Sequence, residues 1–152
     1  MKIYLTWGVG YGKSKALAQT NAQLHAVLDK IKITKLEKLE VQASEVLEDK
    51  TELSKLKGSF PGIVLQNCAK GEVAAALFLC KVGDKIFIGH GKAGSLAKAY
   101  KKANYEVLQA AKDKNVELRW SIGAHAPPKK DTYGCAIVAL VLVNSSINNS
   151  IK

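Results

Sequence analysis

The stretch KIYLTWGVGYGKS, residues 2–14, decides the first part of the fold because it joins a strand pattern to the start of a helix. Residues 2–6 alternate in character and include three large apolar or aromatic side chains, which predicts an opening β-strand. The glycines at positions 8, 10 and 12 are expected to end that strand. The chain therefore begins with a strand that turns directly into a helix.

From residue 13 to about residue 31, apolar side chains recur with helical spacing, which predicts an amphipathic helix that lies on a sheet. They are Leu17, Leu24, Val27, Leu28 and Ile31. The preceding glycines followed by Lys13 and Ser14 resemble a phosphate-binding loop. Trp7, however, stands where that pattern needs its first glycine, so the sequence disfavours nucleotide binding.

The rest of the chain predicts mainly strands and a second long helix. Residues 34–43 form a strand candidate whose Lys and Glu content is also compatible with a continued helix. Residues 49–59 are expected to be a loop, closed by a turn at Pro61-Gly62. Further strands are expected at residues 63–68, 73–82, 85–88, 116–122 and 134–143, with a hairpin turn at 83–84 and a helix at 95–113. Two separate helices and about seven strands predict an α+β sandwich without an internal repeat.

The composition predicts a globular protein with one domain. The chain has 152 residues, 47% of them hydrophobic and 24% charged, which is ordinary for a folded domain. We assign residues 1–143 to that domain and residues 144–152 to a polar tail. The sequence has no apolar stretch long enough for a membrane helix or a signal peptide, so a cytoplasmic location without membrane attachment is expected.

Three cysteines, Cys68, Cys80 and Cys135, are widely spaced among aliphatic residues. Their odd number and surroundings predict buried, reduced thiols rather than a disulfide or a zinc site. The formal net charge of +10 comes almost wholly from lysine, since Arg119 is the single arginine. Because arginine is the residue that forks onto phosphate and guanine, a lysine excess disfavours nucleic acid as the partner.

The three histidines lie far apart in the sequence and have no second ligand at metal spacing, so no metal site is expected. His25 lies beside the apolar stripe of the first helix and is expected to be structural. His90 stands between two glycines at a junction from strand to helix, which favours an exposed, titratable group. His125 precedes two prolines, and the pattern is compatible with either role.

Ser44 follows the alternating stretch KLEVQA, residues 38–43, and precedes the acidic stretch EVLED. No glycine or proline marks an ordinary turn there. A serine in this place is compatible with a plain loop residue or with a self-processing residue whose hydroxyl attacks the carbonyl of Ala43. The second alternative would cut the chain and leave a pyruvoyl group at the new end.

Taken in order, several segments resemble the family of pyruvoyl-dependent arginine decarboxylases. The opening KIYLTWGVG, the helix through Leu24 and Leu28, and the strand ending at Ser44 are similar to the start of that family. So are FPGIV at residues 60–64, AAAL at 74–77, and Gly91 with its following helix. The resemblance closes with His125 followed by GCAIVAL at residues 134–140.

The resemblance implies an αββα sandwich that assembles as a homotrimer or a multiple of it, with active sites between subunits. It implies self-cleavage between Ala43 and Ser44 and a pyruvoyl cofactor derived from Ser44, without metal. The expected reaction is the decarboxylation of an amino acid, arginine to agmatine. An alternative is a non-catalytic relative with the same fold that acts as a partner subunit or binding module.

The resemblance also assigns site residues. The family's proton-donating glutamate belongs near Gly89, where His90 is the expected substitute. The carboxylate that would pair with a guanidinium falls near Leu24, and an asparagine of the next strand falls near Lys38. Leu24 and Lys38 are therefore the expected substrate-binding positions.

Overall fold

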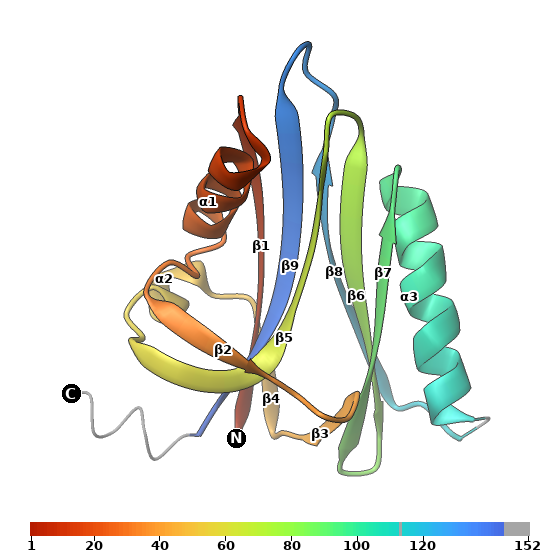
Figure 1. The fold of residues 1–152 in the computed structure, drawn as a ribbon. Helices are drawn as coiled ribbons and strands as arrows, with labels where there is room; N and C mark the ends of the chain where they lie inside the picture. Colours follow the sequence, from red (N-terminus) through yellow and green to blue (C-terminus); the bar gives the residue numbers. More distant parts are fainter. Residues whose placement is uncertain (113, 145–152) are drawn as a thin grey trace.

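Two β-sheets and three helices form the α+β fold in the computed structural model, which describes residues 1–112 and 114–144 (Figure 1). The mixed five-stranded sheet has the order β2 (Ile31–Lys35), β5 (Gly58–Ala69), β9 (Tyr133–Val143), β1 (Lys2–Gly12), β4 (Glu45–Leu47). The antiparallel four-stranded sheet has the order β3 (Glu40–Gln42), β7 (Lys85–Ala93), β6 (Val73–Val82), β8 (Leu118–Ala126). The helices are α1 (Lys15–His25), α2 (Lys50–Leu53) and α3 (Leu96–Ala111). Beyond Asn144, the predicted polar tail lies outside the described residues.

The sheets pack face to face, and one long helix covers the outer face of each (Figure 1). Strand β9 shows why its sequence is apolar throughout. Ala136, Val138 and Leu140 belong to the core between the sheets, whereas Ile137 and Ala139 belong to the core beneath α1. A strand that is buried on both faces needs apolar side chains at every position.

The glycines of the opening stretch do not end the first strand, contrary to the prediction. Strand β1 continues through them to Gly12, and α1 lies directly on Gly8 and Gly10. A Cβ atom at either glycine would overlap backbone atoms of α1 around Ala18 and Ala22. The glycines therefore let the helix approach the sheet closely, which is their second common use besides turns.

This close approach also corrects the predicted face of the first helix. The buried side chains of α1 are Ala18 and Ala22, whereas Leu17 and Leu24 are 48% and 52% exposed. Only small residues fit where a helix rests on glycines, so the larger leucines point outward. The helix ends at His25 rather than near Ile31, and Val27 has a φ of 56° just beyond it.

The pair β7 and α3 repeats the packing of β1 and α1. Gly89 and Gly91 lie against the backbone of α3 around Ala99 and Ala103, just as Gly8 and Gly10 lie against α1. The numbering difference is 81 at every matched position, including the N-cap serines Ser14 and Ser95. We call residues 2–25 the first βα unit and residues 85–111 the second βα unit.

The strand order extends this match to the antiparallel strands beside each unit, but not to the short outer strands, because β4 is parallel to β1 whereas β3 is antiparallel to β7. The strands around the first unit run β4-β1-β9-β5, and those around the second run β3-β7-β6-β8. The sequence shows no internal repeat, but the two βα units resemble one another in structure. Local sequence identity between the units is confined to a few small residues, which explains why the similarity was missed.

Several other predicted elements are confirmed, with shifted ends. Strand β6 spans the predicted residues, and the two-residue turn at Gly83 and Asp84 joins it to β7. The candidate strand at 34–43 is instead divided between β2 and β3, which belong to different sheets. Pro61 and Gly62 lie within β5 rather than in a turn, and the predicted loop at 49–59 contains the short helix α2.

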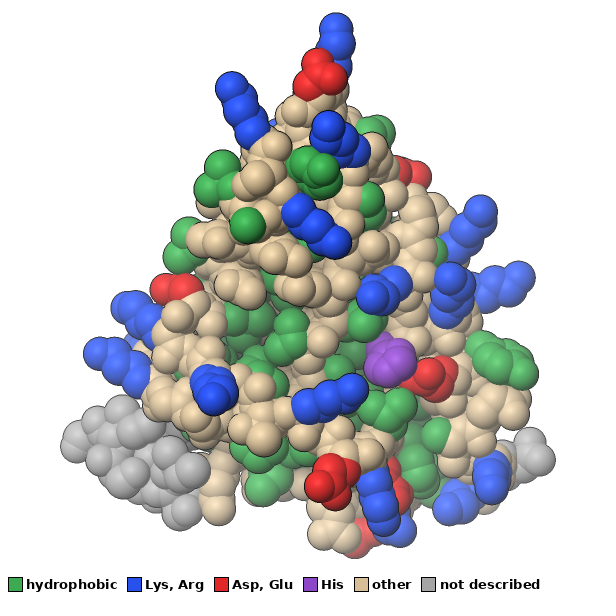
Figure 2. Space-filling model, in the orientation of Figure 1, with side chains coloured by type: hydrophobic (Ala, Val, Ile, Leu, Met, Phe, Trp, Pro, Cys, Tyr) green, Lys and Arg blue, Asp and Glu red, His purple; other side chains and the backbone are tan. Residues whose placement is uncertain are grey.

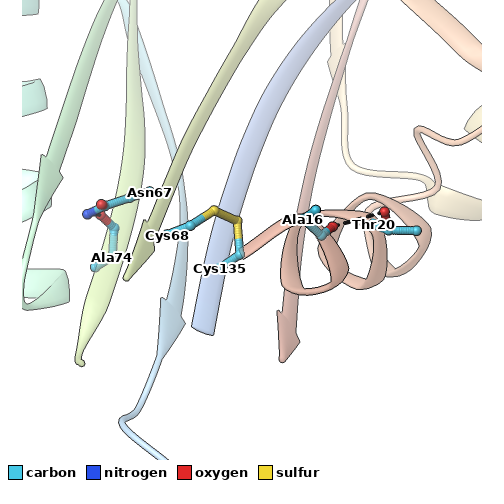
Figure 3. The surroundings of a disulfide bond; sticks show 6 residues. All are labelled: Ala16, Thr20, Asn67, Cys68, Ala74 and Cys135. Atoms are coloured by element: carbon cyan, nitrogen blue, oxygen red, sulfur yellow. Dashed lines mark hydrogen bonds between the residues drawn. A yellow bond between two sulfur atoms is a disulfide. The ribbon is translucent and has the colours of Figure 1, made fainter. Parts of the chain in front are cut away.

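The prediction of three reduced cysteines is wrong. Cys68 on β5 and Cys135 on β9 are register partners with Cα atoms 4.1 Å apart, and their sulfur atoms form a disulfide beside α1 (Figure 3). Adjacent antiparallel strands bring these residues together although they are 67 positions apart in the sequence. Cys80 is free and buried, as predicted, and burial raises the pKa of its thiol, an effect that the charge of Arg119 partly opposes.

Candidate functional site

The peptide between Ala43 and Ser44 lies where the chain crosses from one sheet to the other. Strand β3 pairs with β7 in the four-stranded sheet, and β4 pairs with β1 in the five-stranded sheet. Only Ala43 and Ser44 lie between these two short strands. Each side of the peptide is thus held by a different sheet.

Ser44 is exposed and makes two hydrogen bonds to the first residue of the chain. Its backbone N–H donates to the carbonyl oxygen of Met1 at 2.9 Å, and its hydroxyl donates to the same oxygen at 3.1 Å. These bonds fix the position of the crossing. In this rotamer the hydroxyl is directed at Met1 rather than at the carbonyl carbon of Ala43.

Two hollows border the crossing. The larger has a volume of about 640 Å³ and is lined by Met1, Val41, Gln42, Ala43, Ser44, Asp84 and Leu142. The smaller, about 50 Å³, lies between the sheets and adds Glu45, Val46, Lys81, Ile86, Leu118 and Trp120. The crossing therefore faces open space on one side and the end of the core on the other.

Three lining residues that lie far from Ser44 in the sequence were not predicted: Asp84, Lys81 and Trp120. The side chain of Gln42 donates to the Asp84 carboxylate at 3.3 Å, which ties the β6–β7 turn to the strand before Ser44. The hairpin turn at Gly83-Asp84 was the available signal for Asp84. Its position beside Ser44 depends on the pairing of β3 with β7, which the local sequence does not reveal.

His90, the expected proton donor, does not line either hollow. Gln42 is the register partner of Lys85, and His90 lies five residues further along β7. At a rise of about 3.3 Å per residue, this separates His90 from the crossing by roughly 16 Å along the strand. His90 instead pairs with Glu106 of α3, whose carboxylate oxygen lies 3.2 Å from Nδ1.

The two expected substrate-binding residues also lie away from the crossing. Leu24 is exposed on the outer surface of α1, and Lys38 is exposed in the connection between β2 and β3. Neither lines the hollows beside Ser44. Within one chain, the structure thus brings Ala43 and Ser44 together with Asp84 and Lys81, but not with His90, Leu24 or Lys38.

His25 has the structural role that its sequence position predicted. Its Nδ1 atom accepts a hydrogen bond from the backbone N–H of Val9 at 2.9 Å, and its ring meets Trp7 edge to face. Lys50 completes this cluster, because its ammonium group lies 4.3 Å from the Trp7 ring centroid and donates to the carbonyl oxygen of His25. Partial burial lowers the pKa of Lys50.

His125 forms a second histidine–glutamate pair, far from Ser44 in the fold. Its Nε2 atom lies 2.7 Å from a carboxylate oxygen of Glu72, which belongs to the connection between β5 and β6. No group of three His, Cys, Asp or Glu side chains arranged for a metal ion occurs within residues 1–112 and 114–144. None of the helices in this part of the chain has the length and apolar character needed to cross a bilayer.

No known protein-family model matches this chain. A search among curated proteins likewise finds no significant match.

Proposed function

We propose that this chain is a self-cleaving, pyruvoyl-dependent amino-acid decarboxylase, with arginine as the substrate and agmatine as the product. The observation that carries the proposal is the two-residue crossing at Ala43 and Ser44, whose flanks are anchored in different sheets. A peptide clamped on both sides can be cut without separating the fragments. The new chain end would stay in the hollow where it formed.

The first step uses only groups of this chain. The Ser44 hydroxyl turns away from the Met1 carbonyl and its Oγ bonds to the carbonyl carbon of Ala43, while the peptide C–N bond breaks to give an ester and a free amine. Loss of the Ser44 Cα proton then expels the Ala43 carboxylate. Hydrolysis of the resulting dehydroalanine consumes one water, releases ammonia and leaves a ketone at position 44.

The residues around the crossing fit this chemistry. Glu45 and Asp84 provide carboxylates that can accept protons from Ser44, and Lys81 provides an ammonium group on the side of the small cavity. When formed, the ketone supplies the electron sink for loss of carbon dioxide from an amino acid bound through its amine. Asp84 faces the open hollow, where a carboxylate would favour a cationic substrate such as arginine.

Protonation by His90 requires a second copy of the chain, because His90 of the same chain lies far along β7. The resemblance to decarboxylases that act as trimers with sites between subunits is consistent with this arrangement. We therefore propose a homotrimer in which His90, Leu24 or Lys38 of a neighbouring subunit approaches Ser44.

The decisive experiment is an intact-mass spectrum and a denaturing gel of the purified chain. The proposal expects a fragment ending at Ala43 and a second fragment of residues 44–152 whose N-terminus resists Edman degradation and gains mass with a hydrazine. Ser44→Ala should remain one chain. Ser59→Ala, which changes an exposed serine on β5, should be cut like the unaltered protein. A single uncut chain in every preparation would refute pyruvoyl chemistry.

The contacts of Ser44 favour one alternative, a non-catalytic subunit or binding module with the same fold. Both the amide and the hydroxyl of Ser44 are used to hold the Met1 carbonyl, which is a sufficient structural reason for a serine. On this alternative the chain stays intact, and Ser44→Ala lowers the unfolding free energy by about 1 kcal/mol through the lost side-chain hydrogen bond. Release of carbon dioxide from arginine by a cut chain would exclude it.

A further inference from the structure

A cleft of about 620 Å³ lies between α3, β7 and β5, away from the Ser44 crossing of the same chain but around His90, the residue proposed above to meet Ser44 of a neighbouring subunit. Its volume is within the usual range for sites that bind small molecules, about 300–1,000 Å³. Leu65 of β5 contributes an apolar wall, and Tyr105 of α3 is 68% exposed beside it. Figure 2 shows this side of the molecule, where hydrophobic side chains are exposed between lysine side chains.

The charged groups of this cleft leave an excess of positive charge. Lys92, Lys101 and Lys102 line it, and Glu106 is the only carboxylate among its lining residues. The Glu106 carboxylate already accepts a hydrogen bond from the backbone N–H of His90 at 2.9 Å and contacts the His90 ring. Three ammonium groups against one carboxylate give two net positive charges from the lysine and glutamate side chains.

The two βα units share a packing frame, by which we mean the glycines of the strand, the small residues of the helix that lie on them and the N-cap serine. The first unit shows that this frame does not require the charges of the cleft. At the positions matched by the difference of 81, Lys92, Lys101 and Lys102 correspond to Tyr11, Thr20 and Asn21. Asn21 donates to the Tyr11 carbonyl oxygen at 2.7 Å, as Lys102 donates to that of Lys92 at 2.9 Å. The same contact can thus be made by a neutral side chain.

The ring of Tyr105 also has no counterpart in the first unit, where Leu24 takes the matching position, and Glu106 is matched by His25. The shared packing explains one role of Glu106, because His25 likewise accepts a hydrogen bond from a backbone N–H of its adjacent strand. It does not explain three lysines and an exposed tyrosine around one cleft.

We propose that this cleft binds a small phosphorylated molecule. A phosphate monoester carries close to two negative charges near neutral pH, which matches the net charge of the lining. Lys92 and Lys101 hold the phosphate, since Lys102 is committed to the Lys92 carbonyl. The organic part of the ligand lies against Leu65 and the ring of Tyr105.

The test is a titration of the full chain, followed by amide NMR, with phenyl phosphate, inorganic phosphate and phenol as probes. Phenyl phosphate should shift the amides of Gly91, Lys92 and Lys101 in a saturable manner. Inorganic phosphate should shift the same amides with a weaker affinity, because it lacks the ring. Phenol should bind at least about tenfold more weakly than phenyl phosphate, because it lacks the charge.

Matched variants locate the site. Lys101→Gln should weaken phenyl phosphate by about three- to tenfold, as expected for one charge-assisted hydrogen bond. Lys98→Gln makes the same change on the same helix outside the cleft and should alter the affinity by less than about twofold. Tyr105→Leu, which copies the first unit, should weaken phenyl phosphate but not inorganic phosphate.

Three outcomes would overturn the proposal. Absence of saturable shifts at about 10 mM phenyl phosphate would show that there is no site of useful affinity. An equal loss in Lys98→Gln and Lys101→Gln would assign the binding to diffuse surface charge. Displacement of phenyl phosphate by a thymidine oligonucleotide at a far lower concentration, with a steep dependence on salt, would assign the surface to single-stranded nucleic acid instead.

Discussion

The two βα units of this protein share one packing frame and differ in almost everything placed on it. In both, alternate glycines of a strand receive a helix through small residues, and a serine caps the helix. In both, a side chain of the helix also accepts a hydrogen bond from a backbone N–H at the open side of the strand. His25 accepts from Val9, and Glu106 accepts from His90. The shared features are those that close approach and a protected sheet edge demand.

One difference lies in the residues that pair with these glycines on the neighbouring strands. Gly10 is followed across the five-stranded sheet by Cys135 and then Cys68, which form the disulfide. Gly91 is followed across the other sheet by Ala76 and then Gly123. There the ring of Tyr100 lies over the second glycine, where a Cβ atom would overlap its hydroxyl. A disulfide beside the first unit thus corresponds to an aromatic ring of the second unit.

This comparison teaches which residues serve the fold and which are free to serve function. Where the units agree, the physical reason is visible in the packing. Where they disagree at exposed positions, as at Lys92, Lys101 and Tyr105 of the second unit, packing gives no reason. A residue of α3 or β7 that differs from its counterpart in the first unit is therefore not required by the packing frame.

The largest expected effect comes from filling the frame itself. Gly10→Ala and Gly91→Ala should each lower the free energy of unfolding by about 3–5 kcal/mol, because the new Cβ would overlap helix backbone that cannot rotate away. Urea denaturation followed by circular dichroism measures the loss. Equal losses in the two variants would show that the units depend on the same contact.

The matched control for this pair is Gly71→Ala, since a Cβ atom there has no neighbour within 4 Å. Its unfolding free energy should change by less than about 0.5 kcal/mol. If Gly91→Ala lowered the unfolding free energy as little as Gly71→Ala, α3 would not depend on its glycine contact. The two units would then not share the same packing requirement.

The next effect concerns the disulfide, which only the first unit's sheet contains. Reducing the bond between Cys68 and Cys135 should lower the unfolding free energy by about 2–4 kcal/mol, mainly because the unfolded chain regains the freedom of a long loop. The measurement is urea denaturation of oxidised and reduced protein in the Cys80→Ala background, where alkylation counts only the paired thiols. Identical unfolding free energies of the two forms would show that the disulfide does not stabilise the pairing of β5 with β9.

The sequence predicted strand β6 and the second helix well, because strong apolar character and helical spacing are local properties. Val73–Val82 is the clearest case, since its flanking turns are marked by glycine. The first helix was predicted with the wrong face. Leucines normally mark a buried face, and only the glycines on the opposing strand, which lies elsewhere in the pattern, show that alanines must take their place.

The candidate site was predictable only in part for a similar reason. Ser44 was identified from its own neighbours and from a family resemblance, whereas Asp84 and Lys81 reach it through strand pairings that no local pattern encodes. The disulfide was missed because Cys68 and Cys135 are joined by register rather than by spacing. Pairing between strands that are distant in the sequence is the property that a single sequence predicts least well.

The smallest expected effect tests the two edge contacts. His25→Ala and Glu106→Ala each remove the acceptor of one edge amide, and each should lower the unfolding free energy by about 1 kcal/mol. Amide hydrogen exchange gives the sharper measurement, since Val9 should lose protection only in the first variant and His90 only in the second. Glu106→Gln retains an acceptor oxygen and should preserve most of the protection of His90. If the Val9 amide stayed protected without His25, the two edge contacts would not be equivalent. The similarity of the two units would then be limited to the glycine contacts and the N-cap serines.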